Sequence, residues 1–409
     1  MIFRNRPLVR LGAAALLASG AITAFGAPAH AAGTETDLAI DVVGTRVADG
    51  AAGKLAFAKV TNKGKNTPSE LGVRIDVSKL DFAKVAVVPF AEECDVEPGS
   101  QGPALVTCWA EKEALPGPGE TIDLPVVLVK LVESLDKAYS APVKFTIISK
   151  DDTNKDNNTK SVDVEFSKES GADLTVLADD VKNAVKVKNG KIEVTGDLHA
   201  GDTAQLIYEV VNQGDMPTAG LKVTVKLPKG VTFTETEDEC EYAADNRSLV
   251  CTYPELPFIP LTQFDGKGDD VPGGEFYHLL SVGADVKAGA LKGGTVSVEP
   301  ILPAKGLTAQ SKVIKRLPKN MTPLQKSDLA DLDPSDNTDG FAVVVAAKGG
   351  GGGGVGGGDD EGGLPVTGAK AGLIGGIGAA VLLAGGAMFL VARRRRVVLV
   401  TPGDEKPTA

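Results

Sequence analysis

The chain has 409 residues, enough for two or three domains, and only 5% of its residues are aromatic. Its 54 acidic and 43 basic residues give a net charge of −11. Subtracting the +3 of residues 1–31 and the +4 of residues 368–409 leaves −18 for the region between them. Because so acidic a region repels phosphate backbones, we expect no nucleic acid among its partners.

The first 31 residues have the order of a secretory signal peptide. Three arginines precede the apolar run 11–24, and Ala29-His30-Ala31 then supplies a small-x-small cleavage site. The apolar run is too short for a membrane anchor. We therefore expect export of the chain and a mature N-terminus at Ala32.

Residues 32–347 contain two copies of one pattern, which we assign to residues 32–168 and 169–347. The matching stations, first copy then second, are Asp37-Leu38 and Asp173-Leu174, Asn62-Lys63-Gly64 and Asn212-Gln213-Gly214, Glu93-Cys94 and Glu239-Cys240, Cys108 and Cys251, Gly119-Glu120 and Gly274-Glu275, and Asn158-Thr159 and Asn337-Thr338. Agreement in both order and residue type indicates a duplication. The second copy is longer, with surplus near 183–194, 262–271 and 301–323 that we interpret as loops or added hairpins.

Both copies are rich in short runs of valine, threonine and isoleucine separated by turn residues, as in Leu206–Val210 and Leu221–Val225. This pattern predicts an all-β fold of two tandem antiparallel β-sandwiches. The stations, together with Leu227–Phe233, resemble the Ig-like repeats of bacterial surface proteins that are classed as domains of unknown function, and the CARDB-like adhesion domains. The first copy departs from that pattern at Lys79–Phe82. Because such domains act as spacers, adhesive tips or parts of assemblies, the resemblance implies a fold rather than one activity.

Four cysteines occur as one pair in each copy, and the chain is expected to be exported. We therefore predict disulfides between Cys94 and Cys108 and between Cys240 and Cys251, each closing a short hairpin. The alternative roles, a thiol nucleophile or metal ligands, lack a histidine at matching positions. Trp109, the only tryptophan, follows one of these cysteines, where packing explains it.

No catalytic constellation is visible, so we expect no enzyme and no cofactor. The mature chain has two histidines, His199 and His278, at positions that the first copy does not share, and we interpret them as surface or packed residues. Asp152, Asn154, Asp156 and Asn158 alternate as the ligands of a calcium loop would, but Asx-turns before the last strand explain them equally well. Asp331, Asp333 and Asp336 form a second acidic turn at the corresponding place. We assign no metal ligand.

The C-terminus combines four segments in a fixed order. A glycine-rich tether at 348–363 is followed by Leu364, Pro365, Val366, Thr367 and Gly368, an uncharged run at 371–392, and the tail 393–409, which opens with four arginines. At about 1.5 Å per residue, the uncharged run is long enough to cross roughly 30 Å of hydrocarbon as a transmembrane helix. Clustered arginines mark the cytoplasmic side of a span, which places the folded part outside.

This order resembles the sorting signal of LPXTG cell-wall proteins of Gram-positive bacteria. The resemblance implies a sortase that recognises Leu364 to Gly368 and attacks the carbonyl of Thr367. It then implies that peptidoglycan becomes covalently attached to Thr367. We therefore interpret the chain as a secreted, sortase-anchored stalk or display unit of the cell wall, whose precursor is held in the membrane. The alternative is an adhesin that binds an unknown extracellular ligand through loops of the first copy.

Overall fold

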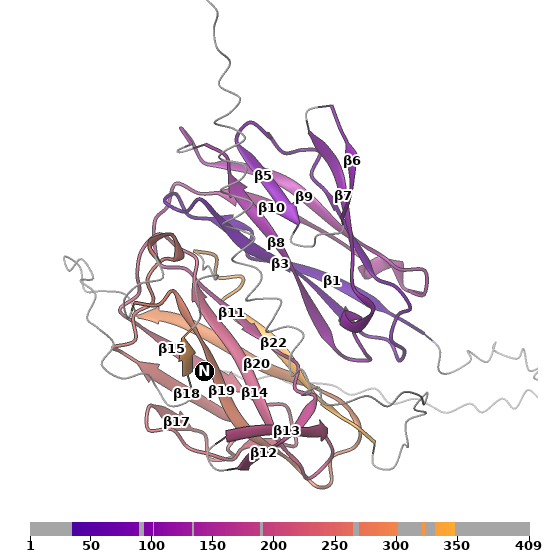
Figure 1. The fold of residues 1–409 in the computed structure, drawn as a ribbon, viewed down its shortest axis with the longest axis vertical. Coiled ribbons are helices and arrows are strands. Elements are labelled where there is room, and N and C mark those ends of the chain that lie inside the picture. The colour runs from indigo at the N-terminus through magenta and orange to yellow at the C-terminus, as the bar shows by residue number, and fades with distance from the viewer. Residues whose placement is uncertain are drawn as a thin grey trace, which may run out of the picture. The chain divides into compact units, whose positions relative to one another are not determined.

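The computed structural model describes residues 35–347 except 90–93, 101, 133–134, 189–190, 265–269, 302–320 and 324–331, and the described residues belong to one compact unit, Glu35–Ala409. These residues form β-strands joined by turns and three short 3-10 helices (Figure 1). The prediction of an all-β fold built from antiparallel sheets is confirmed. The predicted signal peptide, tether, sorting motif, span and tail lie outside the described residues.

Ten strands between residues 38 and 166 form two sheets, which together make the first module. One sheet has the order β1 (Leu38–Val43), β3 (Gly53–Asn62), β8 (Thr121–Lys130) and β5 (Val85–Pro89). The other has the order β2 (Arg46–Val47), β10 (Thr159–Phe166), β9 (Tyr139–Ile148), β4 (Gly72–Asp76), β7 (Pro103–Trp109) and β6 (Cys94–Pro98). Neighbouring strands are antiparallel apart from β2, which runs parallel to β10. The 3-10 helices are η1 (Lys112–Ala114) and η2 (Lys155–Asn157).

The second module repeats this strand order in two further sheets. One contains β11 (Leu174–Ala178), β14 (Thr203–Asn212), β19 (Gly273–Val282) and β16 (Val231–Phe233), with β21 (Met321–Pro323) paired to β19. The other has the order β17 (Cys240–Tyr242), β18 (Ser248–Tyr253), β15 (Gly220–Lys226), β20 (Gly289–Ile301) and β22 (Thr338–Val345). Of the predicted surplus, residues 183–194 fall in an added hairpin of β12 (Asn183–Lys188) and β13 (Lys191–Asp197), and η3 (Leu261–Gln263) lies near the second surplus segment.

Each module has a hydrophobic core of its own, because alternate residues of its strands point between its two sheets. In β14, for example, Leu206, Tyr208 and Val210 are buried while the residues between them are partly exposed. The matching strand β3 instead buries residues on both of its faces: Ala56, Ala58 and Val60 belong to the core, and Leu55 and Phe57 form a separate buried cluster. A strand buried on both faces must be covered by something besides its own partner sheet.

The asparagine of each Asn-x-Gly station ties three backbone segments together. The Asn62 side chain donates from Nδ2 to the carbonyls of Asn66 and Pro116, each at 2.9 Å, and accepts from the Gly64 amide at 2.9 Å. In the second module, Asn212 makes the corresponding bonds to Met216, Phe258 and Gly214. Both asparagines are fully buried, so removing either amide would leave backbone groups unsatisfied. The repeated motif is therefore a structural clamp of the fold.

Both predicted disulfides are present, and each joins residues that face one another across a hairpin. Cys94 pairs with Cys108 between β6 and β7, and Cys240 pairs with Cys251 between β17 and β18. Cys251 is fully buried and belongs to the core of the second module. Each bond thus fixes an edge strand of its sheet to the strand beside it.

We predict that replacing Cys240 and Cys251 together by alanine lowers the free energy of unfolding by about 3 kcal/mol, because the bond restricts a short loop of the unfolded chain. The loss should exceed that of the Cys94→Ala/Cys108→Ala pair, since Cys251 also fills the core. Thermal and urea unfolding of both double variants would measure the difference. Equal losses would contradict the contribution that we assign to core packing.

Candidate functional site

The side of β3 that faces away from its own core contacts the second module. The second module presents the carboxylates and an amide, and the first presents mainly backbone N–H groups. The Thr45 and Arg46 amides donate to Asp333 Oδ2 at 2.8 and 3.2 Å. Further backbone bonds run from Gly44 to Ser335 Oγ at 3.2 Å, from Gly50 to Asp215 Oδ2 at 2.9 Å, and from Thr121 to Asp180 Oδ2 at 2.8 Å. We call this set of contacts the junction.

A glutamine in the second Asn-x-Gly station completes the hydrogen bonding of β3. Gln213 Oε1 accepts from the Leu55 amide at 2.8 Å, and Gln213 Nε2 donates to the Leu55 carbonyl at 3.3 Å. The same Nε2 donates to Thr175 Oγ1 at 2.8 Å. Gln213 is 4% exposed, so its side chain takes the place of a neighbouring strand for one residue of β3. The corresponding residue of the first station is Lys63.

Lys54 of β3 points into a group of aspartates of the second module. Its side chain is 1% exposed, and its Nζ lies 3.5 Å from Asp336 Oδ2 and 3.9 Å from Asp333 Oδ2. Gly44, with a φ of +72°, brings the first module close at this point, because a Cβ there would lie 2.8 Å from the Asp336 carboxylate. One ammonium group therefore interacts with more than one carboxylate of the second module.

Burial and the shared lysine divide these carboxyl groups into charged and protonated forms. Burial raises the pKa of Asp173 to about 9, with Lys54 opposing the rise and Asp336 adding to it. Burial likewise raises the pKa of Asp336, although Lys54 attracts its charged form. Burial by itself would also raise the pKa of Asp333. Lys54 and the hydrogen bonds from Ser335 and Thr45 outweigh this effect and hold the pKa below its usual value. Asp173 is thus protonated at neutral pH, so it adds no further negative charge to the buried carboxylates around Lys54.

A second lysine of β3 also bridges the modules. Lys59 Nζ lies 2.8 Å from Asp123 of the first module and 2.8 Å from Asp339 of the second. Burial lowers the pKa of Lys59, but the attraction of the two aspartates outweighs it and the net shift is upward. Asp339 Oδ2 also accepts from the Ala178 amide at 2.8 Å. Close by, Leu177 of β11 packs on the cluster of Leu55, Phe57 and Val127, which gives the junction an apolar centre.

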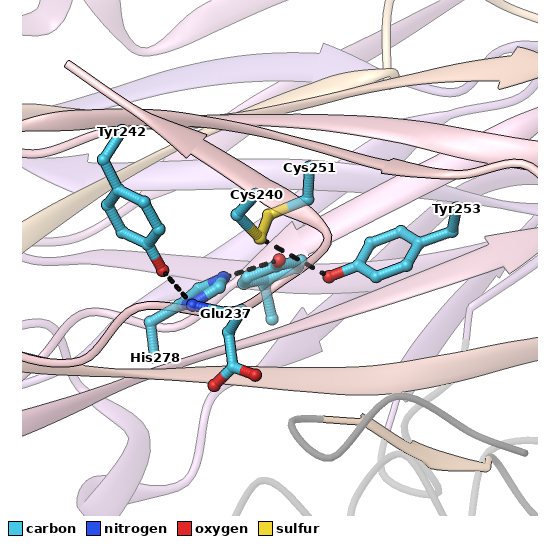
Figure 2. The surroundings of a disulfide bond; sticks show 7 residues. Glu237, Cys240, Tyr242, Cys251, Tyr253 and His278 are labelled. Atoms are coloured by element: carbon cyan, nitrogen blue, oxygen red, sulfur yellow. Dashed lines mark hydrogen bonds between the residues drawn. A yellow bond between two sulfur atoms is a disulfide. The ribbon is translucent and has the colours of Figure 1, made fainter.

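The predicted disulfide of the second module lies over a buried aromatic cluster (Figure 2). The Tyr253 hydroxyl lies 4.0 Å from Cys240 Sγ, and the Glu237 amide donates to the Tyr242 hydroxyl at 3.2 Å. His278 is 5% exposed, its Nε2 lies 3.0 Å from the Tyr208 hydroxyl, and burial lowers its pKa to about 4. A neutral ring packed among aromatic side chains fits the prediction that this histidine has a packing role.

The other sequence candidates take the following places. His199 is partly exposed, and its Nδ1 lies 2.9 Å from the Asp197 carbonyl, beside a turn. Trp109 covers the backbone of Gly72 but remains 43% exposed, so packing explains only one of its faces. Within the described ranges, three or more His, Cys, Asp and Glu side chains nowhere come together in a way that could hold a metal ion. No helix in the same ranges is long and apolar enough to cross a membrane.

No protein-family model matches the sequence, and no curated protein sequence matches it. Solved structures do align with 76% of the chain. They include the C-terminal domain of the AgI/II polypeptide BspA from Streptococcus agalactiae (10% identity, all of that chain, TM-score 0.21) and the collagen adhesin CNA from S. aureus (11%, 93%, 0.20). A transglutaminase of the red sea bream also aligns (10% identity, 32% of that chain, TM-score 0.21). At these scores the similarities carry no argument about what this chain does.

Sequence reasoning did not single out Lys54, Lys59 or Asp339, which lie at the centre of the junction. It noted Asp333 and Asp336 only as an acidic turn, and Gln213 only as part of a repeated motif. The available signal was a difference between the copies: by the Asn-x-Gly stations Lys54 corresponds to Ala204, and a lysine among the apolar residues of a strand requires a buried partner.

We predict that Lys54→Met lowers the free energy of unfolding by about 3 kcal/mol, since it leaves buried carboxylates without their cation. Adding Asp336→Asn should restore part of the loss, giving a coupling of about 1 kcal/mol or more in a double-mutant cycle. Lys160→Met is the control, because the Lys160–Asp41 pair is 44% and 60% exposed and should contribute no more than about 0.5 kcal/mol. Equal effects of the two lysine variants would contradict the importance of the junction.

We also predict that the contribution of Asp173 to the free energy of unfolding falls as the pH rises from about 4 to about 9. The pKa of Asp173 is about 9 in the folded chain and near 3.8 in the unfolded chain, so the folded state binds the extra proton and loses this advantage at alkaline pH. Asp173→Asn keeps the shape without titrating, and it should flatten the dependence by about 1 kcal/mol or more. Thermal unfolding of both proteins across this range would test it. A variant that follows the native pH profile would refute the assignment.

Proposed function

We propose that the chain is a sortase-anchored surface protein of a Gram-positive cell wall, whose two modules act together as one non-catalytic stalk or display unit. The anchoring part of this proposal is supported by the order of sorting motif, uncharged run and arginine cluster in residues 364–396. The display part is supported by the junction, where Lys54 of one module is buried among carboxyl groups of the other. Export is supported by the signal peptide pattern.

Anchoring uses the C-terminal residues as substrate. The uncharged run and the arginines hold the precursor in the membrane while the sortase cysteine attacks the carbonyl carbon of Thr367. The bond from Thr367 to Gly368 breaks, and an amine of a cell-wall precursor then displaces the cysteine, so that Thr367 ends in an amide with peptidoglycan. Residues 368–409 are released. Before the motif, the glycine-rich tether at 348–363 would supply reach.

A stalk must resist bending where its modules meet, and the junction has the features for that task. It combines backbone hydrogen bonds, one buried and one partly buried lysine, and an apolar cluster. A flexible linker between independent modules would need none of these contacts. The contacts therefore favour two modules that move as one rigid body over two independent modules joined by a flexible linker.

An adhesin remains the second candidate, and one observation favours it. Trp109 and Val96 of the six-stranded sheet are 43% and 56% exposed, in a chain with few aromatic residues. Exposed large apolar side chains are more frequent at binding surfaces than elsewhere. On this reading, the first module would present a ligand-binding edge while the second module and the tether hold it away from the wall.

The anchoring proposal predicts the chemical form of the protein in the wall. After muralytic digestion, mass spectrometry of the native protein should find a C-terminal peptide that ends at Thr367 and carries a peptidoglycan fragment. Thr367→Ala should accumulate in the membrane or the medium instead, because the sortase does not cleave it. Thr401→Ala, a change in the predicted cytoplasmic tail, serves as the control and should be anchored normally. A wall-associated native chain that extends to Ala409 would refute the proposal.

A further inference from the structure

The loop before the last strand has the same place in both modules, so its residues can be compared one by one. Asn158 accepts the Ile147 amide at 2.8 Å, and Asn337 accepts the Val298 amide at 2.8 Å. Counting back from these matched residues, Asn157 corresponds to Asp336 and Asn154 to Asp333. At the start of each module, Asp37 and Asp173 correspond, because their carbonyls accept the amides of Lys63 and Gln213. The first module therefore has its own version of the pocket that receives Lys54.

In the first module, amide side chains partly replace the lysine. Asn157 Nδ2 and Asn154 Nδ2 donate to Asp37 Oδ1 at 2.8 and 3.3 Å. The nearby Lys155 Nζ donates to the Ser149 carbonyl at 2.8 Å. These bonds satisfy one oxygen of Asp37, but they do not use the remaining oxygens of the loop.

Several polar atoms of this loop are buried and lack a partner in the described part of the chain. They are Asp152 Oδ2, Asn157 Oδ1, both amide atoms of Asn158, and Ser149 Oγ. Asp152 is 4% exposed and Asn158 is 3% exposed, so water has little access to them. Leaving a buried carboxylate oxygen unpaired is costly, which indicates that something else satisfies it.

The unpartnered oxygens belong to side chains that are already fixed around one small region. Asp152 is held through its other oxygen, which accepts the Asn154 amide at 3.1 Å. Asn157 is held through its nitrogen by Asp37. The backbone of Asp152 also forms an isolated β-bridge with the backbone of Thr36, the residue before Asp37. One carboxylate oxygen of Asp152 and the amide oxygens of Asn157 and Asn158 thus lack a partner in the loop that corresponds to the one facing Lys54, while Asp156 is exposed.

We propose that the loop 149–158, together with Asp37, binds a calcium ion. The unpartnered oxygens of Asp152, Asn157 and Asn158 are the ligand type of a hard divalent cation, and Asp37 and Asp152 supply the two negative charges that balance it. Asp152, Asn157 and Asn158 coordinate the ion through their unpartnered oxygens, and water completes its shell. The ion stabilises this loop of the first module, as Lys54 stabilises the corresponding loop of the second.

Calcium binding to the purified full chain, measured by isothermal titration calorimetry in metal-free buffer with calcium chloride, tests this proposal. We expect one site, with a rise in the unfolding temperature when calcium is added. Asp152→Asn should weaken binding at least about tenfold, because it removes a ligand charge. The matched control Asp156→Asn removes the same charge from the exposed side of the loop and should change the affinity less than about threefold.

Unfolding temperatures measured without calcium show whether a variant has lost the binding site or has lost stability in general. Asp152→Asn should fold in metal-free buffer at least as stably as the native chain, since it removes a desolvated charge, and calcium should no longer raise its unfolding temperature. No calcium binding at millimolar concentrations would overturn the proposal, as would binding that survives Asp152→Asn but is lost in Asp156→Asn. Because wall anchoring does not involve this loop, neither result affects the anchoring experiment.

Discussion

The structure depends on one electrostatic constraint, the burial of Lys54 where the two modules meet. An ammonium group that is 1% exposed cannot persist without anionic partners, so the first module is complete only when the second supplies Asp336 and Asp333. Burial raises the pKa of Asp173, and the neighbouring Asp336 carboxylate adds to the rise, so Asp173 retains its proton. The two modules therefore have separate apolar cores but share one polar network.

This constraint also explains the choice of residues around the lysine. Asp333 Oδ2 accepts hydrogen bonds from two backbone amides of the first module. The Gln213 side chain hydrogen-bonds the backbone N–H and C=O of Leu55. Such contacts position two surfaces in one register, whereas apolar contacts alone would allow sliding. The leucine and phenylalanine of the small cluster between the modules then add burial without specifying the angle. Polar groups give the junction its geometry, and apolar groups give it part of its free energy.

Much of the fold could be predicted from the sequence, because the informative signals were local. Short runs such as Leu206–Val210 indicated strands, and the paired positions of Cys94 with Cys108 and of Cys240 with Cys251 indicated disulfides, which the structure contains. The junction could not be predicted in the same way, since Lys54 and Asp336 are 282 positions apart and each alone resembles an ordinary charged residue. Periodicity tells which side chains are buried within a module, but it does not tell which face another module will cover.

The differences between the two copies carry the information that their similarities lack. The duplication gave both modules the same clamp at Asn62 and Asn212 and the same loop before the last strand. Where only one copy meets a lysine, the loops have diverged: Asp333 and Asp336 face Lys54 in the second module, and Asn154 and Asn157 stand at those positions in the first. A loop that must neutralise an ammonium group needs carboxylates, whereas a loop with a calcium ion or water can use neutral amides. The substitution pattern thus follows from which end of each module is covered by its neighbour.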